Sequence, residues 1–451
     1  METILFLIAC LSLLLWAYLI FLHGRFWQAD AQLDPGRREP ASWPAVAILV
    51  PAGTDTDALE EALPGLLGQS YPGAFHVVVI DEYGGSGVAD AAYGTARAVG
   101  AAERLSVLAV GAPPKGWSRR AWALAQAQEH AATTLPGTRY LWLTETWATQ
   151  GSRSLRGLVA KAEADRCDLV SLLPFSPCET AWDRLLAPAF AFFFQAFHPF
   201  SRVNDLQHPA AVAAPGCTLV ALDPLRTAGG FAAVKTVPAP EAALASAIKA
   251  VSRQAGRGIW LGLGEESVAI RADDGWRALA DATRTSVAAR LRSAPLHLAA
   301  DTLAMALACL APPLVFLCAL VAGLFLDIDQ YLLTFVTILL ACAAWAAMAV
   351  AAWPTYSLYD LEEWHTLTVP LAAAVQILLT IALLPGLRGR AARPGQAAAG
   401  ATKAAQPPSG AVKIEPRLDV PPPAAGARPV EPPARKAATG GHALRQRIAR
   451  S

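Results

Sequence analysis

Acidic residues stand at several points in the first third of the chain where a short apolar run ends. They are Asp55 after residues 46–50, Asp81 and Glu82 after residues 75–80, and Glu145 after residues 140–144. In open α/β sheets, ligands bind beyond the carboxyl ends of the strands. Carboxylates there can hold a nucleoside, or a hard divalent cation bound to its phosphates. The spacing therefore predicts a nucleotide-binding edge.

A pair of arginines follows the turn GAPPKGW and opens an expected helix. Ser118 is suited to be the N-cap of this helix, which places Arg119 and Arg120 in its first turn. Cations are poorly placed there, because the helix dipole favours anions at the N-terminus. Either the two side chains are simply solvated, or they meet an anionic ligand such as a phosphate.

The elements that carry these residues alternate between strand and helix. The run 46–50, the helical spacing of leucines over 55–67 and the β-branched run 75–80 predict a parallel βαβ unit with a right-handed crossover. Further apolar runs lie at 105–110, 140–144, 169–173 and 213–222. The alternation predicts an α/β domain with a doubly wound sheet.

Apolar segments on both sides of this domain predict a membrane protein. The chain is 54% hydrophobic and 16% charged, which is too apolar for a purely soluble enzyme. Residues 4–22 are long enough to cross a bilayer. A cleaved signal peptide is disfavoured, because the segment before them carries Glu2 and no basic residue. Further spans are expected at 303–326, 331–353 and 367–384, the first kinked or made re-entrant by Pro312 and Pro313.

The charges beside these segments determine the orientation only in part. Basic residues at positions 25, 37 and 38 follow the first span, so the positive-inside rule places the next domain in the cytoplasm. Three further spans would put the tail outside, yet basic residues at 388, 390 and 393 follow the last one. Either one stretch does not cross the membrane or the charge rule is overridden.

Two segments near the membrane parts have their own patterns. Residues 185–200 contain six Phe and two Pro, and fit a membrane-surface segment, the wall of an acceptor tunnel or a buried core helix. Residues 276–292 carry four arginines and predict an interfacial helix. The seven cysteines form no CxxC pair, so we interpret them as small buried side chains and not as a disulfide framework or zinc site.

Five regions follow from these patterns. They are a transmembrane anchor (1–24), an α/β domain (44–264), an interfacial amphipathic region (265–298), a C-terminal transmembrane region (299–386) and a basic Ala/Pro-rich tail (387–451). The tail lacks periodicity and is expected to be disordered. We expect the membrane as a partner and no nucleic acid.

Several segments resemble one known family. They are SWPAVAILVPA, LLGQSYPGAFHVVVID, the Gly116–Trp117 turn with Trp122–Ala123, CETAWDRLLAPAFAFFFQAFHPFSRVND, GRGIWLGL and LAPPL. Over about residues 10–385 the chain resembles the family 2 (GT-A) glycosyltransferases, and within them the bacterial hopene-associated glycosyltransferases. The resemblance implies a GT-A-like mixed sheet, a nucleotide-sugar donor and a hopanoid- or polyisoprenoid-type lipid acceptor. It also implies hopanoid-pathway enzymes as partners and a bacterial inner-membrane location with the soluble domain facing the cytoplasm.

The resemblance implies roles for single residues in an inverting sugar transfer. Asp55, Asp81 and Glu82 would contact the nucleoside, and Arg119 and Arg120 the phosphates. Glu145 would contact the diphosphate side and the metal, and Arg290 would be a further donor contact. Glu241 would be the general base. The family's cation would be Mg²⁺ or Mn²⁺.

The motifs that carry these roles depart from the family's pattern. Trp147 stands where the second acid of the Asp-x-Asp motif would bind the metal, and an indole cannot coordinate one. Arg120 replaces a lysine, Arg290 replaces a glutamine, and Gly84–Gly87 replace a Ser-x-Asp-Gly segment. Two hypotheses follow: a membrane-bound glycosyltransferase, or a pseudoenzyme that binds lipid or scaffolds partner enzymes. A transporter has less support, because the spans contain no charged pair.

Overall fold

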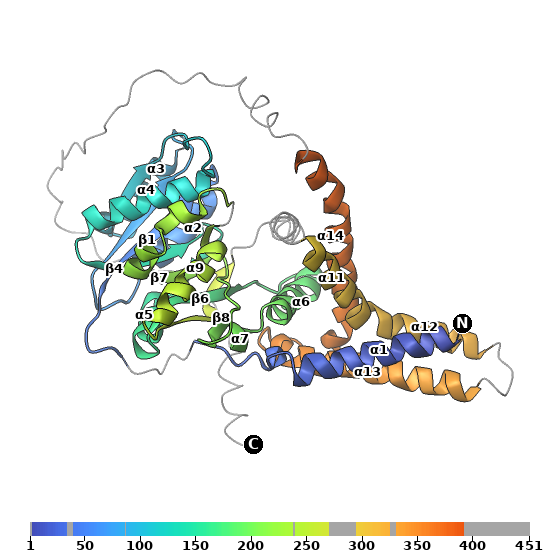
Figure 1. Cartoon of the computed structure of the whole chain (residues 1–451). Coiled ribbons are helices and arrows are strands. Elements are labelled where there is room, and N and C mark those ends of the chain that lie inside the picture. Colours follow the sequence, from blue (N-terminus) through green and yellow to red (C-terminus); the bar gives the residue numbers. More distant parts are fainter. Residues whose placement is uncertain are drawn as a thin grey trace. The chain divides into compact units, whose positions relative to one another are not determined.

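The computed structural model describes residues 2–33, 39–85, 87–237, 240–269, 295–324 and 331–391. Residues up to 384 form one compact unit, which consists of an α/β domain and several long apolar helices (Figure 1). The expected interfacial helix at 276–292, the tail beyond 391 and the residue Arg290 lie outside the described residues.

A single eight-stranded mixed sheet forms the centre of the α/β domain. Its spatial order is β3-β2-β1-β4-β7-β6-β8-β5. The strands are β1 (Ala45–Ala52), β2 (Phe75–Asp81), β3 (Leu105–Ala109), β4 (Thr138–Thr144), β5 (Ala148–Gln150), β6 (Cys167–Phe175), β7 (Cys217–Ala221) and β8 (Gly258–Ala269). Strands β1 to β4 are mutually parallel, whereas β7 runs antiparallel to both of its neighbours. The expected doubly wound mixed sheet is confirmed, and β8 runs five residues past the expected boundary at 264.

Helices cover both faces of this sheet. They are α2 (Thr56–Leu67), α3 (Val88–Ala98) and α5 (Ser154–Ala164) on one face, and α4 (Arg119–Thr134), α8 (Leu222–Thr227) and α9 (Pro240–Gln254) on the other. The side chains of β1 alternate between the two cores: Ile48 and Val50 face the first set, and Leu49 faces the second. Burial on both faces explains why the parallel strands are continuous apolar runs without polar alternation.

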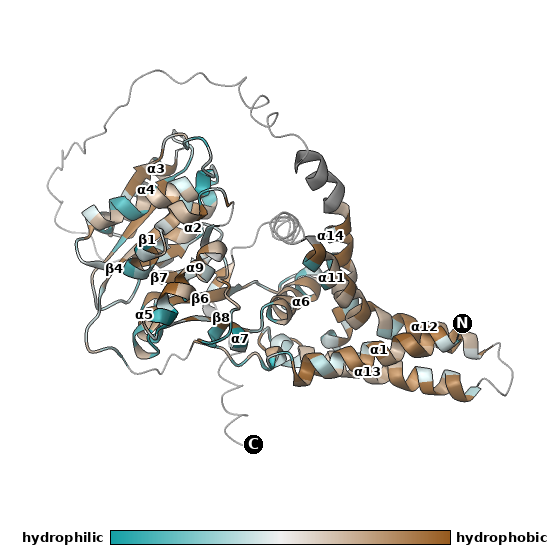
Figure 2. Cartoon of the chain, in the orientation of Figure 1, coloured by the Kyte–Doolittle hydropathy of each residue, from teal (hydrophilic) through white to brown (hydrophobic). Residues whose placement is uncertain are grey.

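Apolar helices before and after the α/β domain form a second part of the described chain. They are α1 (Glu2–Phe21), α11 (Pro295–Met305), α12 (Ala311–Gly323), α13 (Tyr331–Ser357) and α14 (Val369–Ala391). Among the described residues, four helical segments are long and apolar enough to cross a membrane, at 2–21, 296–323, 331–357 and 363–382. Figure 2 shows α1, α12 and α13 as predominantly hydrophobic along their lengths. The predicted membrane segments are therefore confirmed as long apolar helices.

A π-helical turn, η4 (Ala306–Leu310), joins α11 to α12 directly before the two prolines. Pro312 has no N–H, so the carbonyl groups four and five residues before it lose a helical donor. Those carbonyl groups accept hydrogen bonds from α1 instead: Ser12 donates to Leu307 at 2.9 Å and Trp16 donates to Ala308 at 2.8 Å. The expected interruption at the prolines thus becomes a joint between α1 and the C-terminal helices.

The phenylalanine-rich segment is a helix, α6 (Ala181–Phe197), which begins with a capping box between Thr180 and Asp183. Leu186, Phe192 and Phe193 are buried in one cluster with residues of α1, α13 and α14. The segment therefore packs its apolar face against the membrane helices, which fits the core-helix alternative.

Candidate functional site

The carboxyl ends of β1, β2 and β4 meet at one edge of the sheet. Ala52, the last residue of β1, pairs with Asp81, the last residue of β2. The backbone N–H of Glu82 continues this pairing and donates to the carbonyl of Ala52 at 3.3 Å. Because β4 is parallel to β1, Glu145 leaves the sheet at the same edge. The acids that follow β2 and β4 therefore lie at the same edge of the sheet.

Arg120 lies between two of these acids. Its Nη2 forms an ion pair with Oε1 of Glu145, and its Nη1 lies 3.9 Å from Oε1 of Glu82. The three side chains are only 13–19% exposed, so solvent screens the interaction less than it would at a surface. We call Glu82, Arg120 and Glu145 the strand-end ion cluster.

Arg119 contacts the residues that directly follow β2. Its Nη1 donates to the backbone carbonyl of Glu82 at 2.6 Å, and its guanidinium lies 4.6 Å from the ring centre of Tyr83. Of the two interpretations of the arginine pair, simple solvation is wrong, because both guanidinium groups contact groups of the strand-end edge. Tyr83 follows the predicted acids directly in the chain but was not recognised as part of the site.

Asp81 shapes the turn that follows β2. Its side chain is 4% exposed, and Oδ1 accepts hydrogen bonds from the backbone N–H groups of Tyr83 at 3.1 Å and Gly84 at 2.8 Å. Gly84 and Gly85 both have positive φ angles, which a residue with a side chain rarely adopts. The glycine run is therefore required by the conformation of the turn.

Asp55 follows β1 at the same edge but has a local role. Its carboxylate accepts a hydrogen bond from the N–H of Ala58 at 3.1 Å and caps α2, and the residue is exposed. Among the described contacts it has none with the strand-end ion cluster.

Glu241, the expected base, is the second residue of α9, and its side chain lies outside the described part. The chain just before α9 is tied to the start of α4. The Ser118 N–H donates to the carbonyl of Lys235 at 2.5 Å, and the Ser118 hydroxyl donates to that of Val237 at 2.8 Å. Lys235 and Val237 are thus held against the start of α4, next to the arginine pair.

The donor set at this edge does not fit the expected Mg²⁺ or Mn²⁺ site. Glu145 is already paired with Arg120. Trp147 packs against Gly216, where an added Cβ would lie 2.7 Å from the indole. Among residues that the structure describes, no group of three His, Cys, Asp or Glu side chains could hold a metal ion. Gly216 is a further residue of the site that the sequence did not reveal.

The cysteines supply no nucleophile to this edge. All seven are free, and Cys217, at the start of β7, is fully buried. Burial raises the pKa of the Cys217 thiol to about 12 and that of Cys167 to about 11. Both thiols therefore stay protonated at neutral pH.

No protein-family model and no curated protein sequence matches the chain. Among solved structures, the mannosyltransferase PcManGT from Pyrobaculum calidifontis, in complex with GDP-Man and Mn²⁺, aligns with 85% of this chain and 98% of its own, at 17% identity and a TM-score of 0.47. TarS from S. aureus aligns with 58% of this chain and 42% of its own, at 13% identity and a TM-score of 0.33. A fragment of TarS (1–349) in complex with UDP-GlcNAc aligns with 77% of this chain and 92% of its own, at 12% identity and a TM-score of 0.33. At these values, the similarity transfers no activity or ligand to this chain.

Proposed function

We propose that the chain is a membrane-bound GT-A glycosyltransferase-like protein that moves a sugar from a nucleotide-sugar donor to a lipid acceptor. The observation that supports the proposal most strongly is the strand-end ion cluster, with Arg119 and Asp81 beside it. Two guanidinium groups and three acids meet beyond the carboxyl ends of β2 and β4, where open α/β sheets bind nucleotides.

The arginine pair is the part of the site suited to a diphosphate. Arg120 exchanges Glu145 for a phosphate oxygen when the donor binds, and Arg119 moves from the Glu82 carbonyl to a second one. Both exchanges keep each guanidinium hydrogen-bonded, and the Glu145 carboxylate that Arg120 releases is hydrated instead, because its side chain is 17% exposed. The guanidinium groups then stabilise the diphosphate as it leaves, a role for which the family's metal is not needed.

The remaining roles are those that the family resemblance implies. Asp81, Glu82 and Asp55 face the nucleoside, and Glu241 at the start of α9 removes the proton from the acceptor hydroxyl in an inverting transfer. Arg290 is a further donor contact. The acceptor is a hopanoid- or polyisoprenoid-type lipid in the inner membrane of a bacterium, with the α/β domain in the cytoplasm.

A transfer assay tests the proposal. The full chain is reconstituted in vesicles of bacterial lipid extract and incubated with radiolabelled UDP- and GDP-sugars, with and without Mn²⁺. We expect label in the lipid phase, its loss in Glu241→Gln, and no requirement for Mn²⁺. Absence of lipid-bound label with every donor would contradict an active transferase.

The ion cluster also supports a second candidate, a pseudoenzyme that keeps the fold to bind lipid or scaffold partner enzymes. Glu145, to which the resemblance assigns a metal contact, is already ion-paired with Arg120, and Trp147 stands in place of the second acid of the Asp-x-Asp motif. This candidate predicts that Glu241→Gln and Glu145→Gln leave the cellular phenotype intact, whereas deletion of α6 abolishes it. The transferase predicts that Glu241→Gln alone already abolishes it.

A further inference from the structure

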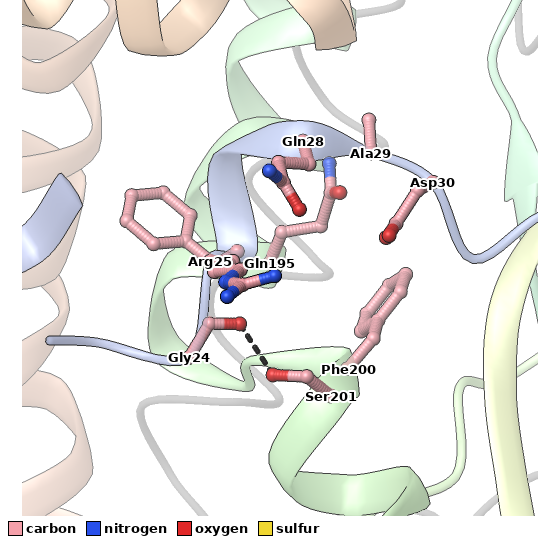
Figure 3. Close-up of a pocket in the computed structure, with 9 residues that line it drawn as sticks. Gly24, Arg25, Gln28, Ala29, Asp30, Gln195, Phe200 and Ser201 are labelled. Carbon is pink, nitrogen blue, oxygen red and sulfur yellow. Dashed lines mark hydrogen bonds between the residues drawn. The ribbon is translucent and has the colours of Figure 1, made fainter. Parts of the chain in front are cut away.

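A cavity of about 160 Å³ lies where the end of the N-terminal helix meets α6 and α7 (Phe200–Asn204). Figure 3 shows its lining, which includes Gly24, Arg25, Gln28, Asp30, Gln195 and Ser201. A buried site of roughly 15 Å³ already admits a water molecule, so this space has room for a small polar group of several atoms. It is separate from the strand-end ion cluster, with which it shares no residue.

Gln195 presents an unused acceptor to this cavity. The side chain is 1% exposed, and its Nε2 donates to the carbonyl of Ala191 at 3.2 Å and to the hydroxyl of Thr355 at 3.0 Å. The carbonyl can only accept, which fixes the amide with Nε2 toward Ala191. Within the described part of the chain, Oε1 accepts no hydrogen bond. A buried acceptor without a partner is unfavourable, so the cavity favours an occupant that donates to Oε1.

The other polar side chains restrict the occupant further. The side chains of Arg25, Gln28 and Asp30 make no hydrogen bond or ion pair with any residue that the structure describes. Ser201 donates its proton to the carbonyl of Gly24, which leaves its oxygen as an acceptor (Figure 3). The lining therefore combines one cation and one anion with several acceptors. A free phosphate would face Asp30 and the Gln195 oxygen, whereas a hydroxyl both donates and accepts and suits every group.

Exposed apolar residues at the end of α1 precede the cavity lining in the chain. Phe21 is 78% exposed and Leu22 is 69% exposed, and only His23 separates Leu22 from Gly24 in the chain. Phe21 is the last residue of α1, a helix that is long and apolar enough to span a membrane, and Leu22 follows it. A ligand with its polar end in the cavity would lay its hydrocarbon on Phe21 and Leu22, so a lipid fits the site better than a soluble polyol.

We propose that this cavity binds the uncharged, hydroxyl-bearing headgroup of a membrane lipid, with a hydroxyl donating to Gln195 Oε1 and Arg25 and Asp30 closing the entrance. The site requires neither donor binding nor catalysis at the strand-end edge. Its test uses no nucleotide, so its failure leaves the proposed function untouched.

Equilibrium binding of tritiated 1-monooleoylglycerol to the detergent-purified full chain tests the proposal. We expect one saturable site, displaced by unlabelled 1-monooleoylglycerol but not by methyl oleate, which has the chain without the hydroxyls. Gln195→Met removes the acceptor at similar length and should weaken binding at least about tenfold. The exposed variants Arg25→Gln and Asp30→Asn should weaken it without a change in melting temperature.

Thr355→Val is the matched control, because it removes the same Nε2 hydrogen bond from Gln195 but leaves Oε1 in place. It should bind like the wild type; equal losses in both variants would mean a purely structural effect and would overturn the proposal. Competition by methyl oleate, by glycerol alone at equal concentration, or preferentially by dioleoyl phosphatidylethanolamine or phosphatidate would overturn it too. The first outcome would indicate a site that recognises only the hydrocarbon chain, the second a site for a soluble polyol, and the third a site for a charged headgroup.

Discussion

At the scale of single residues, the sequence predicted positions at the strand-end edge but not their partners. Asp81, Glu82 and Glu145 could be placed there because acids that follow parallel strands share an edge. That Arg120 would pair with Glu145 could not be predicted, because the pair depends on rotamers and on the approach of α4 to β4. For the same reason the roles of Tyr83 and Gly216 were missed.

The Asp81 carboxylate is expected to stabilise the turn after β2. Asp81→Ala removes the acceptor of two backbone N–H groups and should lower the stability by about 2 kcal/mol, measured as a lower melting temperature. Asp81→Asn keeps an acceptor oxygen and should melt like the wild type. Equal melting of Asp81→Ala and the wild type would show that the carboxylate does not hold the turn.

Two histidines predict acid sensitivity of the α/β domain. His76 and His130 contact the Ser106 hydroxyl at 3.1 and 3.2 Å, and burial lowers the pKa of both below 6.5. The unfolded chain therefore binds protons at a higher pH than the folded chain, so stability is complete above about pH 6.5 and falls as the pH drops toward the folded pKa values.

The measurement is the melting temperature from about pH 7.5 down to about pH 5.5. We expect a decrease that is smaller in His130→Gln, which can still hydrogen-bond Ser106 and Thr134 but does not titrate. An identical pH profile for the two proteins would contradict the assignment.

At the scale of elements, local patterns predicted those strands that are continuous apolar runs, β1 to β4, β6 and β7. They did not predict β8, whose sequence GIWLGLGEESVA contains three glycines and two glutamates. This strand is stabilised by its pairing with β6, a contact between residues about ninety positions apart. The three-residue β5 depends on β8 in turn. Helix α6 was recognised as apolar, but its partners, α1 and α13, are likewise distant in the sequence.

The π-helical joint gives a prediction for α1. Trp16→Phe leaves the Ala308 carbonyl without its donor and should destabilise the helix packing by about 1 kcal/mol, with Ser12→Ala having a smaller effect. Tyr18→Phe is the control, because it removes a hydroxyl group from an exposed residue of the same helix. In detergent, the melting temperature should be lowest for Trp16→Phe, intermediate for Ser12→Ala and highest for Tyr18→Phe. Equal melting temperatures for Trp16→Phe and Tyr18→Phe would show that the Trp16 hydrogen bond does not hold α1 to the C-terminal helices.

At the scale of the whole molecule, residues 1–384 connect a strand-end site to helices of membrane length. Phe175, the last residue of β6, packs against Tyr359 after α13, with ring centres 4.9 Å apart. Phe26 after α1 packs against Phe192 of α6 at 5.6 Å. One aromatic contact thus joins β6 to the segment after α13, and the other joins the segment after α1 to α6.

The central claim is that the strand-end edge binds the nucleotide of a sugar donor through Arg120. Calorimetric titration of the detergent-purified chain with UDP and GDP, each with and without Mn²⁺, tests it most directly. We expect saturable binding of at least one nucleotide without Mn²⁺, weakened at least about tenfold, or about 1.4 kcal/mol, in Arg120→Gln. The surface variant Arg104→Gln should leave binding unchanged. No binding of either nucleotide, or equal binding by Arg120→Gln and the wild type, would contradict the account.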